Sequence, residues 1–518
     1  MKYLRSVRQW GRQPTLAVVL LISFACGFNT WDPTLHSTDR TIATIVADAL
    51  KVHLNSGDLV LLQSWNAATP DTVVGQGWRF NTDRVQTSRL QEFRIPSSEI
   101  ALLEANNSEQ VGILGKAGLS AWSGLTGALT LICIADPKSC FGSCPTFYLD
   151  GETSVPAAEG FSSSFARAPE AVDLDALGRR ARAGERVALT MRNEAPETHA
   201  VRSLRVLAVP VRPTESVFHG TEGGFEIATE VLEPVACESA GKACLDAVRS
   251  VDGFERRSEA DPDDLATWEE MVVVLPATEG KSAIVLAGRN TLLSTFLFYQ
   301  GLAFAGTRLG EMLAEVERGN PALLERVSNL MGMLGGIEIE VAEGAGAWRP
   351  IGTFNEAGPI ASDEIAFPFE ATGSGPIRVR LRMVKGNWRV DAVRLARLGR
   401  HADAIAIQPT FSSDPGIEED QIEHLRDPDR YLVTTMGDVL RMTFEMPTDA
   451  PEYELFLETQ GYYYEWNRSE WIAEEDPLMV ATMLYWPAAA FRKLAPAYKA
   501  MEADMEESFW ASRFRRSP

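Results

Sequence analysis

Ile377-Arg378-Val379-Arg380-Leu381-Arg382-Met383 alternates strictly between apolar residues and arginine, and Ile337-Glu338-Ile339-Glu340-Val341 alternates in the same way with glutamate. A period of two puts successive side chains on opposite faces of a β-strand, so each stretch predicts a strand with one buried and one wet face. The wet faces carry opposite charges, and pairing between them would add on the order of a few tenths of a kcal/mol per contact. Residues 385–388 then turn the chain into 389–398, which predicts the closing hairpin of a small jelly-roll or β-sandwich over 336–399.

Further strands are predicted by short apolar runs that are bounded by turn residues. These runs are 58–62, 129–135, 187–191, 201–209, 271–275 and 283–287. We expect 187–191 to pair with 201–209, and the last two runs to form a hairpin around the turn 277–280.

Helices are predicted at fewer places. Short helices beside capping residues are expected over 98–105 and 173–182. A longer helical stretch over 291–318 is broken by Gly319-Asn320-Pro321, after which a second helix begins. Its apolar part is too short and too interrupted for a membrane span, so a buried helix is expected. A C-terminal helix is indicated by one apolar face made of Leu494, Tyr498, Met501, Met505 and Phe509.

Length and pattern together predict a multidomain, mainly β protein with α segments (α+β), in which β-sandwich or jelly-roll modules precede the C-terminal helix. The chain has 518 residues, which suggests roughly three or four domains of the usual size. In chain order we expect a signal peptide at 1–25, a tether at 26–40, an N-terminal β-rich domain at 41–235, a hairpin plus helical segment at 236–335, the sandwich-like module at 336–399, an acidic linker at 400–429 and a C-terminal α/β module at 430–518.

The N-terminus predicts export. Four basic residues without an acid precede the apolar run 15–25, and Cys26 follows. As a helix the run rises only about 16 Å, far less than a bilayer core of roughly 30 Å. Cys26 directly after it resembles the lipid attachment site of bacterial lipoproteins, which implies a membrane anchor facing the periplasm or the cell surface. Cleavage after Ala25 by an ordinary signal peptidase and an uncleaved anchor are the alternatives, and all three place the folded part outside the cytoplasm.

Charge argues against one class of partner. Acidic residues outnumber basic ones by 71 to 49, which gives a net charge of −22. A field of this sign repels phosphate backbones, so no nucleic acid is expected as a partner.

The familiar catalytic and metal motifs are missing from the sequence. Gly280-Lys281-Ser282 resembles the end of a phosphate-binding loop, but Leu275 stands where that loop needs a glycine. Glu194, Glu197 and His199 could ligate a metal, yet the intervening Ala195-Pro196 favours a solvated loop. We therefore expect no catalytic residue, no metal and no cofactor.

The sharpest local motif is Cys140-Phe141-Gly142-Ser143-Cys144-Pro145. Cys-x-x-x-Cys-Pro resembles thioredoxin-like copper chaperones, in which two thiolates and a distant histidine hold the metal. There the second cysteine opens a helix, whereas residues 146–152 read here as a strand and a turn. The stretch also resembles an uncharacterised bacterial envelope domain that carries C-F-G-x-C-P, a strand and Asp-Gly, a resemblance that implies no activity. A structural disulfide between Cys140 and Cys144 is the expectation favoured here.

The remaining cysteines are expected to form one more bridge and to leave one thiol. Disulfides persist in the oxidising compartments to which export leads. Cys237 and Cys244 could not bridge on a continuous helix, so we predict that Gly241 breaks the segment into a loop that the disulfide closes. Cys133 lies in an apolar run and is the candidate free thiol.

Aromatic residues concentrate near the C-terminus, at Tyr462, Tyr463, Tyr464, Trp466 and Trp471. Exposed rings beside acids such as Glu465 could stack on sugar rings or hold a peptide. The same rings could instead fill the core of a small domain, because Trp and Tyr supply large apolar area there.

Two functions of different classes follow from these observations. The first is a non-enzymatic envelope lipoprotein that binds or scaffolds an unknown protein or carbohydrate ligand and is held to the membrane by a lipid on Cys26. The second is a thiol- or copper-handling envelope protein that uses Cys140 and Cys144.

Overall fold

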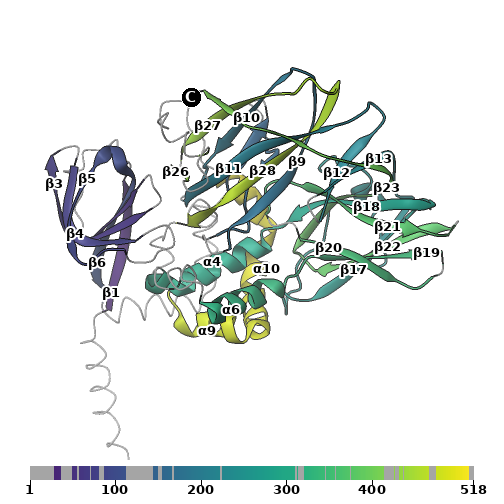
Figure 1. Cartoon of the computed structure of the whole chain (residues 1–518). Coiled ribbons are helices and arrows are strands. Elements are labelled where there is room, and N and C mark those ends of the chain that lie inside the picture. Colours follow the sequence, from purple (N-terminus) through teal and green to yellow (C-terminus); the bar gives the residue numbers. More distant parts are fainter. Residues whose placement is uncertain are drawn as a thin grey trace, which may run out of the picture.

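The computed structural model is mainly β, with 53% of residues in strands and 20% in helices, which confirms the predicted fold class. It contains several mostly antiparallel sheets and a C-terminal helix (Figure 1). The structure describes residues 28–36, 49–54, 58–69, 72–80, 87–111, 144–149, 155–165, 169–195, 197–221, 224–309, 312, 320–344, 346–355, 358–373, 375–412, 425, 431–435, 437–465 and 474–512.

An N-terminal sheet has the strand order β1-β6-β2-β3-β4-β5. Its apolar side chains form a core of their own, which includes Leu50, Leu62 and Leu103. The strands are β1 (Phe28–His36), β2 (Ala49–Leu54), β3 (Leu59–Thr69), β4 (Thr72–Phe80), β5 (Gln91–Pro96) and β6 (Ile100–Val111).

Two predictions are wrong in this sheet. The irregular tether expected over 26–40 contains β1, which pairs with β6 along its whole length. The helix expected over 98–105 is a short 3₁₀ turn, Ser97–Glu99, followed directly by β6. Strand β6 pairs with both β1 and β2, and such pairing overrides a weak local helical preference.

Two further sheets pack face to face as the first sandwich, with a shared core that includes Leu189 from one sheet and Val206 from the other. One sheet has the order β25-β27-β10-β7-β8, and the other β24-β11-β28-β9 with β26 beside β11. The strands are β7 (Thr146–Leu149), β8 (Ala158–Glu159), β9 (Ala171–Arg182), β10 (Arg186–Arg192), β11 (Glu197–Pro210), β24 (Ile405–Ile407), β25 (Thr410–Ser412), β26 (Leu432–Thr435), β27 (Val439–Glu445) and β28 (Glu452–Glu465).

Several predictions change in the first sandwich. The helix expected over 173–182 is strand β9, which pairs with β28. Residues 187–191 and 201–209 are strands as predicted, but β10 and β11 lie in different sheets and do not pair. Strands from the expected linker and C-terminal module, β24 to β28, complete this sandwich. The predicted strand 129–135 lies outside the described residues.

The second sandwich contains every strand from β12 to β23. One sheet has the order β13-β12-β21-β18-β23-β16 and the other β15-β14-β17-β22-β19-β20. The strands are β12 (Ser216–Gly220), β13 (Phe225–Leu232), β14 (Ala236–Ser239), β15 (Lys242–Ala243), β16 (Arg256–Arg257), β17 (Trp268–Ala277), β18 (Gly280–Asn290), β19 (Ile337–Glu343), β20 (Arg349–Phe354), β21 (Asp363–Ala371), β22 (Pro376–Val384) and β23 (Trp388–Ala402).

The alternating strands pair as their charges predict. Strands β19 and β22 are antiparallel, with Glu338 opposite Arg382 and Glu340 opposite Arg380. Arg382 Nη1 lies 2.7 Å from Glu338 Oε2, and Arg380 Nη2 lies 2.5 Å from Glu340 Oε2. The apolar set of β22 is fully buried in the sandwich core: Ile377, Val379, Leu381 and Met383.

Both hairpins predicted in this region are wrong. Strands β17 and β18 are joined by a tight turn, and so are β22 and β23, but in each case the two strands belong to opposite sheets. Each turn therefore carries the chain across the sandwich. The module predicted over 336–399 is accordingly only part of this sandwich, which begins at β12.

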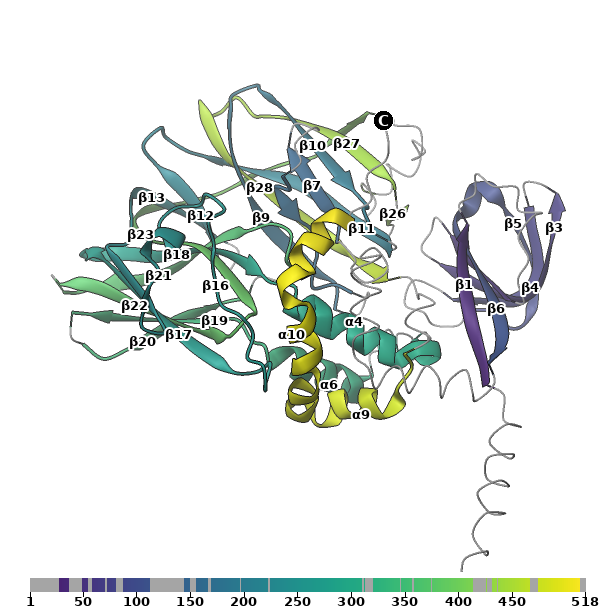
Figure 2. The same cartoon turned by 180° about the vertical axis from the view of Figure 1, so that it is seen from behind.

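Four helices pack together beside the sandwiches, as Figure 2 shows from behind. They are α4 (Leu293–Ala305), α6 (Pro321–Gly332), α9 (Pro477–Tyr485) and α10 (Pro487–Ser512). The predicted break before the second helix is confirmed, because the Asn320 side chain accepts a hydrogen bond from Leu323 N and Pro321 is the first helical residue. The buried helix predicted within 291–318 is α4, and the predicted apolar face of α10 is buried in the shared helical core.

A buried pair, His219 and Asp363, lies where the two sandwiches meet. His219 of β12 lies 2.6 Å from Asp363 of β21, measured from Nε2 to Oδ2. The other oxygen of Asp363 accepts a hydrogen bond of 2.9 Å from Ala176 N, on strand β9 of the first sandwich. The carboxylate therefore links strands of both sandwiches.

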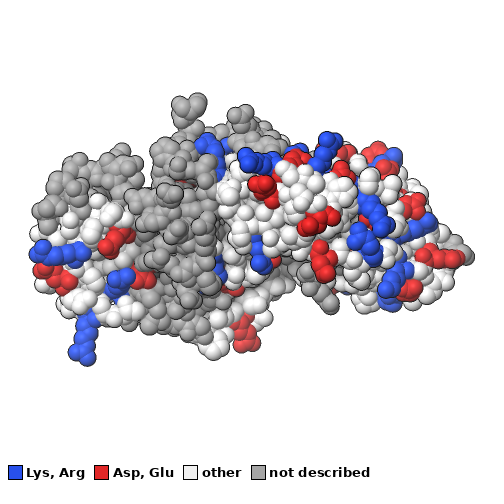
Figure 3. Space-filling model, turned by 45° about the horizontal axis from the view of Figure 1, so that its top comes forward, with Lys and Arg blue, Asp and Glu red and all other residues white. Residues whose placement is uncertain are grey.

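Surface charges of both signs are intermixed over the described face in Figure 3. A typical case is the ladder on β19 and β22 described above. The net charge of −22 is therefore not gathered into one patch on this face.

Candidate functional site

A cavity of about 450 Å³ lies between the second sandwich and helix α10. This volume falls in the range of small-molecule sites, which is about 300–1,000 Å³. The lining comes from β16 and the loop after it, from the start of α4, from the turn before β23, from β23 itself and from α10. The polar lining side chains include Arg257, Thr291, Arg389, Tyr498, Lys499, Glu502 and Glu506.

Glycine is required at one point of this wall. Gly386 has φ = 76°, and a Cβ there would lie 2.5 Å from Ala260 N. Its carbonyl oxygen accepts a hydrogen bond of 2.5 Å from Thr291 Oγ1, and the same hydroxyl oxygen accepts one of 3.1 Å from Leu293 N. The turn between β22 and β23 is thereby fixed to the first turn of α4.

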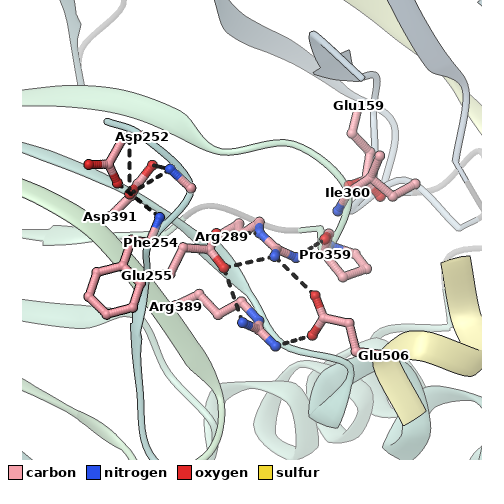
Figure 4. Close-up of polar contacts among 11 residues, drawn as sticks. Glu159, Asp252, Phe254, Glu255, Arg289, Pro359, Ile360, Arg389, Asp391 and Glu506 are labelled. Atoms are coloured by element: carbon pink, nitrogen blue, oxygen red, sulfur yellow. Dashed lines mark hydrogen bonds and ion pairs between the residues drawn. The ribbon is translucent and has the colours of Figure 1, made fainter. Parts of the chain in front are cut away.

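Two arginines and two glutamates form a largely buried network at the wall of the cavity, and Arg389 and Glu506 line it directly (Figure 4). Arg289 of β18 and Arg389 of β23 lie opposite each other in the sheet, where like charges repel. Glu255 bridges them at 2.6 Å from Arg289 Nε and 3.1 Å from Arg389 Nη1. Glu506 of α10 completes the network, at 3.0 Å from Arg289 Nη2 and in contact with Arg389.

The network stabilises the charged form of Arg289. Burial alone would lower the pKa of Arg289, but its hydrogen bonds to Glu255 and the charges of Glu255 and Glu506 raise the pKa above its ordinary value. Two positive and two negative charges then balance, which is the condition under which buried ions are tolerated. Helix α10 is thus held to the second sandwich by charge as well as by apolar packing.

A second carboxylate holds the loop that carries Glu255. Asp391 of β23 accepts hydrogen bonds from Gly253 N at 3.2 Å and from Asp252 N at 3.4 Å, as Figure 4 shows. Burial raises the pKa of Asp391, and these backbone hydrogen bonds oppose the shift. The loop is therefore tied to the same strand that supplies Arg389.

Other charged side chains of the cavity wall also form ion pairs. Lys499 Nζ lies 3.1 Å from Glu259 and 2.5 Å from Glu502, and these carboxylates raise the pKa of Lys499 against the effect of burial. Burial raises the pKa of Tyr498. At neutral pH the lysine stays charged and the tyrosine stays neutral, so neither is suited to proton transfer. Among the described residues, Arg257 is the one charged lining side chain without an ion pair.

Of the predicted disulfides, one is confirmed. Cys237 and Cys244 are bonded, with Cα atoms 5.0 Å apart, and they close the β14–β15 hairpin. Gly241 has φ = 74° at the turn, as the prediction of a broken segment requires.

The predicted bridge from Cys140 to Cys144 is wrong, because Cys144 is a free thiol. Cys144 packs against the core of the first sandwich, and its Sγ lies 3.8 Å from Ser162 O. Burial, and then the charges of Glu159, Glu197 and Glu465, raise its pKa well above the ordinary value. Cys26, Cys133 and Cys140 lie outside the described residues.

Of the two alternatives for the aromatic cluster, core packing is confirmed for the three tyrosines and the exposed ligand surface is wrong for them. Tyr462, Tyr463 and Tyr464 are buried on β28, a central strand with β11 on one side and β9 on the other. Tyr463 faces the sandwich core, whereas Tyr462 and Tyr464 pack on the other face with Tyr431. These three rings belong to the core, and Trp466 and Trp471 lie outside the described residues.

The stretch that contains Glu194, Glu197 and His199 is buried and not the solvated loop that its composition suggests. Glu197 opens β11, and its Oε1 lies 2.8 Å from His199 Nε2. Among the described residues, no group of three or more His, Cys, Asp or Glu side chains is arranged to hold a metal.

Sequence reasoning missed the cavity and its network. Glu255, Arg289, Arg389 and Glu506 come from four distant segments, so no spacing relates them. One sequence feature could have pointed to the network, namely the charged residue Arg289 at the end of the apolar strand run 283–287.

No protein-family model matches the chain, and no curated protein matches it. Among the described helices, none combines the length and apolar character needed to cross a bilayer.

Proposed function

We propose that the protein is an extracytoplasmic lipoprotein of the bacterial cell envelope that acts by binding or scaffolding and not by catalysis. The basic N-terminal residues, the apolar run 15–25 and Cys26 support the location. The lipid on Cys26 would hold the protein to the membrane, facing the periplasm or the cell surface.

The observation that carries the binding role is the cavity under α10. Except for Arg257, its charged groups are held in place by ion pairs within the protein, so most of the wall is ordered before a ligand arrives. The pKa shifts of Lys499 and Tyr498 keep both groups in their ordinary forms, which suits recognition better than acid–base chemistry. Arg257, exposed at the rim, offers a planar cation to a carboxylate or other anionic group of a ligand.

The alternative, a thiol- or copper-handling protein, receives less support. The thiolate is the form that attacks disulfides and binds metals, and the raised pKa of Cys144 keeps this residue protonated. A titration with a thiol reagent and Cu(I) distinguishes the binding role from the thiol- or copper-handling role. We expect slow reaction of Cys144 and no tight copper binding; rapid reaction with stoichiometric copper uptake that Cys144→Ser abolishes would favour the alternative.

The location is tested by metabolic labelling with a fatty acid. We expect label in the wild-type chain and none in Cys26→Ser, with Cys144→Ser as the control that keeps the label. Equal labelling of the wild type and Cys26→Ser would contradict the lipid anchor.

A further inference from the structure

Three large apolar side chains are exposed together on one side of helix α9. Leu478 is 81% exposed, Tyr485 54% and Trp486 64%. Met479 and Met483, on the opposite side of the helix, are buried in the helical core. Helix α9 is therefore apolar on both sides, and only one side is covered by the described part of the chain.

These side chains form a defined surface, which we call the α9 face (Leu478, Tyr485 and Trp486). Leu478 and Tyr485 are seven residues apart, close to two helical turns, so they lie on the same side of α9. The rings of Tyr485 and Trp486 have centroids 5.9 Å apart. The guanidinium of Arg326, on α6, lies 4.2 Å from the centre of the Tyr485 ring.

The chemistry of the α9 face matches the boundary between lipid headgroups and acyl chains. Trp and Tyr rings favour this layer because each has an apolar body and a polar tip. Leu478 can enter the apolar layer below them. Arg326 lies over Tyr485, and Lys493 is exposed in the first turns of α10; these cations suit lipid phosphates.

The position of the face agrees with the proposed anchor. Strand β1 begins at Phe28, two residues after Cys26, and two residues span at most about 7 Å. In Figures 1 and 2, helices α6 and α9 lie along the lower side of the molecule, the side to which the lower end of β1 also points. A membrane that holds a lipid at Cys26 would therefore lie on the side of the molecule at which helix α9 lies.

We propose that the α9 face is a membrane-contact surface that rests in the headgroup layer of the bilayer holding the lipid anchor. This inference rests on the proposed lipoprotein location and adds an orientation to it. A second copy of the chain is a weaker fit, because stable interfaces use about 20–30 residues on each side and the α9 face offers three large side chains.

The test uses the full chain with an environment-sensitive fluorophore on Leu478→Cys. The matched control carries the label on Val235→Cys, an apolar position in the second sandwich that is 57% exposed. The unsubstituted chain gives the background from native thiols. The probe membrane is phosphatidylcholine vesicles, with and without phosphatidylglycerol, that contain lipids with a nitroxide in the headgroup region. Flotation with the vesicles reports anchoring separately.

We expect the emission of the fluorophore at position 478 to shift to the blue and to be strongly quenched when vesicles are added. The fluorophore at position 235 should show neither change. Adding Trp486→Ser and Tyr485→Ser to the Leu478→Cys chain should abolish both changes. Adding Phe254→Ser, an aromatic residue of similar exposure to Trp486, should change nothing. A chain that floats without quenching at 478 would overturn the contact surface but leave the anchor intact. A chain that neither floats nor shows quenching would overturn both. A shift at 478 that follows protein concentration without vesicles would indicate a second copy and overturn the proposal.

Discussion

Glu506 reaches two arginines at once, and that single carboxylate joins helix α10 to the second sandwich. Arg289 and Arg389 are both nearly buried and face each other across the sheet. Their mutual repulsion is offset only while both Glu255 and Glu506 are present. At the scale of residues, a small chemical change at this carboxylate should therefore have a large effect on stability.

Glu506→Gln is expected to lower the free energy of unfolding by about 1–3 kcal/mol, because two buried arginines then share one carboxylate. Urea unfolding monitored by circular dichroism measures the change. The control is Asp504→Asn, an exposed acid on the same helix, with an expected cost of about 0.5 kcal/mol or less. Equal losses for the two variants would show that the network does not hold α10.

The junction between the sandwiches makes stability depend on pH. Burial and the nearby Asp363 raise the pKa of Asp173 to about 6. The pKa of His219 is also raised, because the charge and hydrogen bond of Asp363 outweigh burial, which alone would lower it. A raised native pKa means that the folded state binds more protons than the unfolded state. Protonation of such a group therefore stabilises the folded state. This stabilisation is fully present below the pKa of the unfolded state and is lost as the pH rises through the pKa of the folded state.

For Asp173 this loss falls between its ordinary pKa, about 4, and the folded value of about 6. Asp173→Asn removes the titration, so the variant should gain about 1–3 kcal/mol relative to the wild type between pH 4 and pH 7. Denaturant titrations at several pH values give the difference. A difference that stays constant across this range would contradict the assigned shift.

At the scale of elements, strand β22 carries buried apolar side chains on one face and ion-paired arginines on the other. The two faces should contribute differently to the free energy of unfolding. Leu381→Ala should cost about 2–5 kcal/mol, because Leu381 is fully buried and leaves a cavity. Arg380→Ala should cost less than about 1 kcal/mol, because it loses a partly exposed ion pair. Chemical denaturation of both variants measures the two losses in the free energy of unfolding. Similar costs would mean that the face assignment of β22 is wrong.

Local pattern predicted strands and their faces well, but most of their partners wrongly. The alternation of 377–383 and its charge match with 337–341 gave the correct pairing of β22 with β19. The turns 277–280 and 385–388 contain the same glycine signals as hairpin turns, yet each crosses between sheets. Which of two apolar strands lies beside a third depends on the packing of the whole sandwich, and no local signal carries that information.

The helical errors have a related cause. Residues 173–182 form β9, because their backbone groups pair with β28 over nearly the whole length of the strand. The site was beyond sequence reasoning for the same reason, since Glu255 and Glu506 meet Arg289 only after three distant segments have packed. By contrast, the bridge Cys237–Cys244 depended on one local turn at Gly241 and was predicted correctly.

At the scale of the whole molecule, the two sandwiches differ in how the chain builds them. The second uses one continuous stretch, from β12 to β23. The first combines β7 to β11 with β24 to β28, which come before and after that stretch. Contacts between distant segments form more slowly, because loop closure has to precede them.

We therefore expect the backbone amides of the second sandwich to become protected from hydrogen exchange first when the denatured chain refolds. Pulse-labelling hydrogen exchange with mass spectrometry should show protected amides in β17, β18 and β23 before those in β11 and β28. Simultaneous protection of both sets, or earlier protection of β11, would contradict this order. Reduced and oxidised samples compared in parallel would show whether the Cys237–Cys244 bond influences the early step.

This nested arrangement also has a consequence for biosynthesis. Leu207 of β11 pairs with Phe456 of β28, a partner that the ribosome makes about 250 residues later. At synthesis rates of about 5–20 residues per second, the interval is on the order of 10–50 s. Throughout that time the apolar edge of β11 lacks its neighbour and could pair with another chain. We therefore expect β11 to be a strand that a holding chaperone protects until β28 has been made.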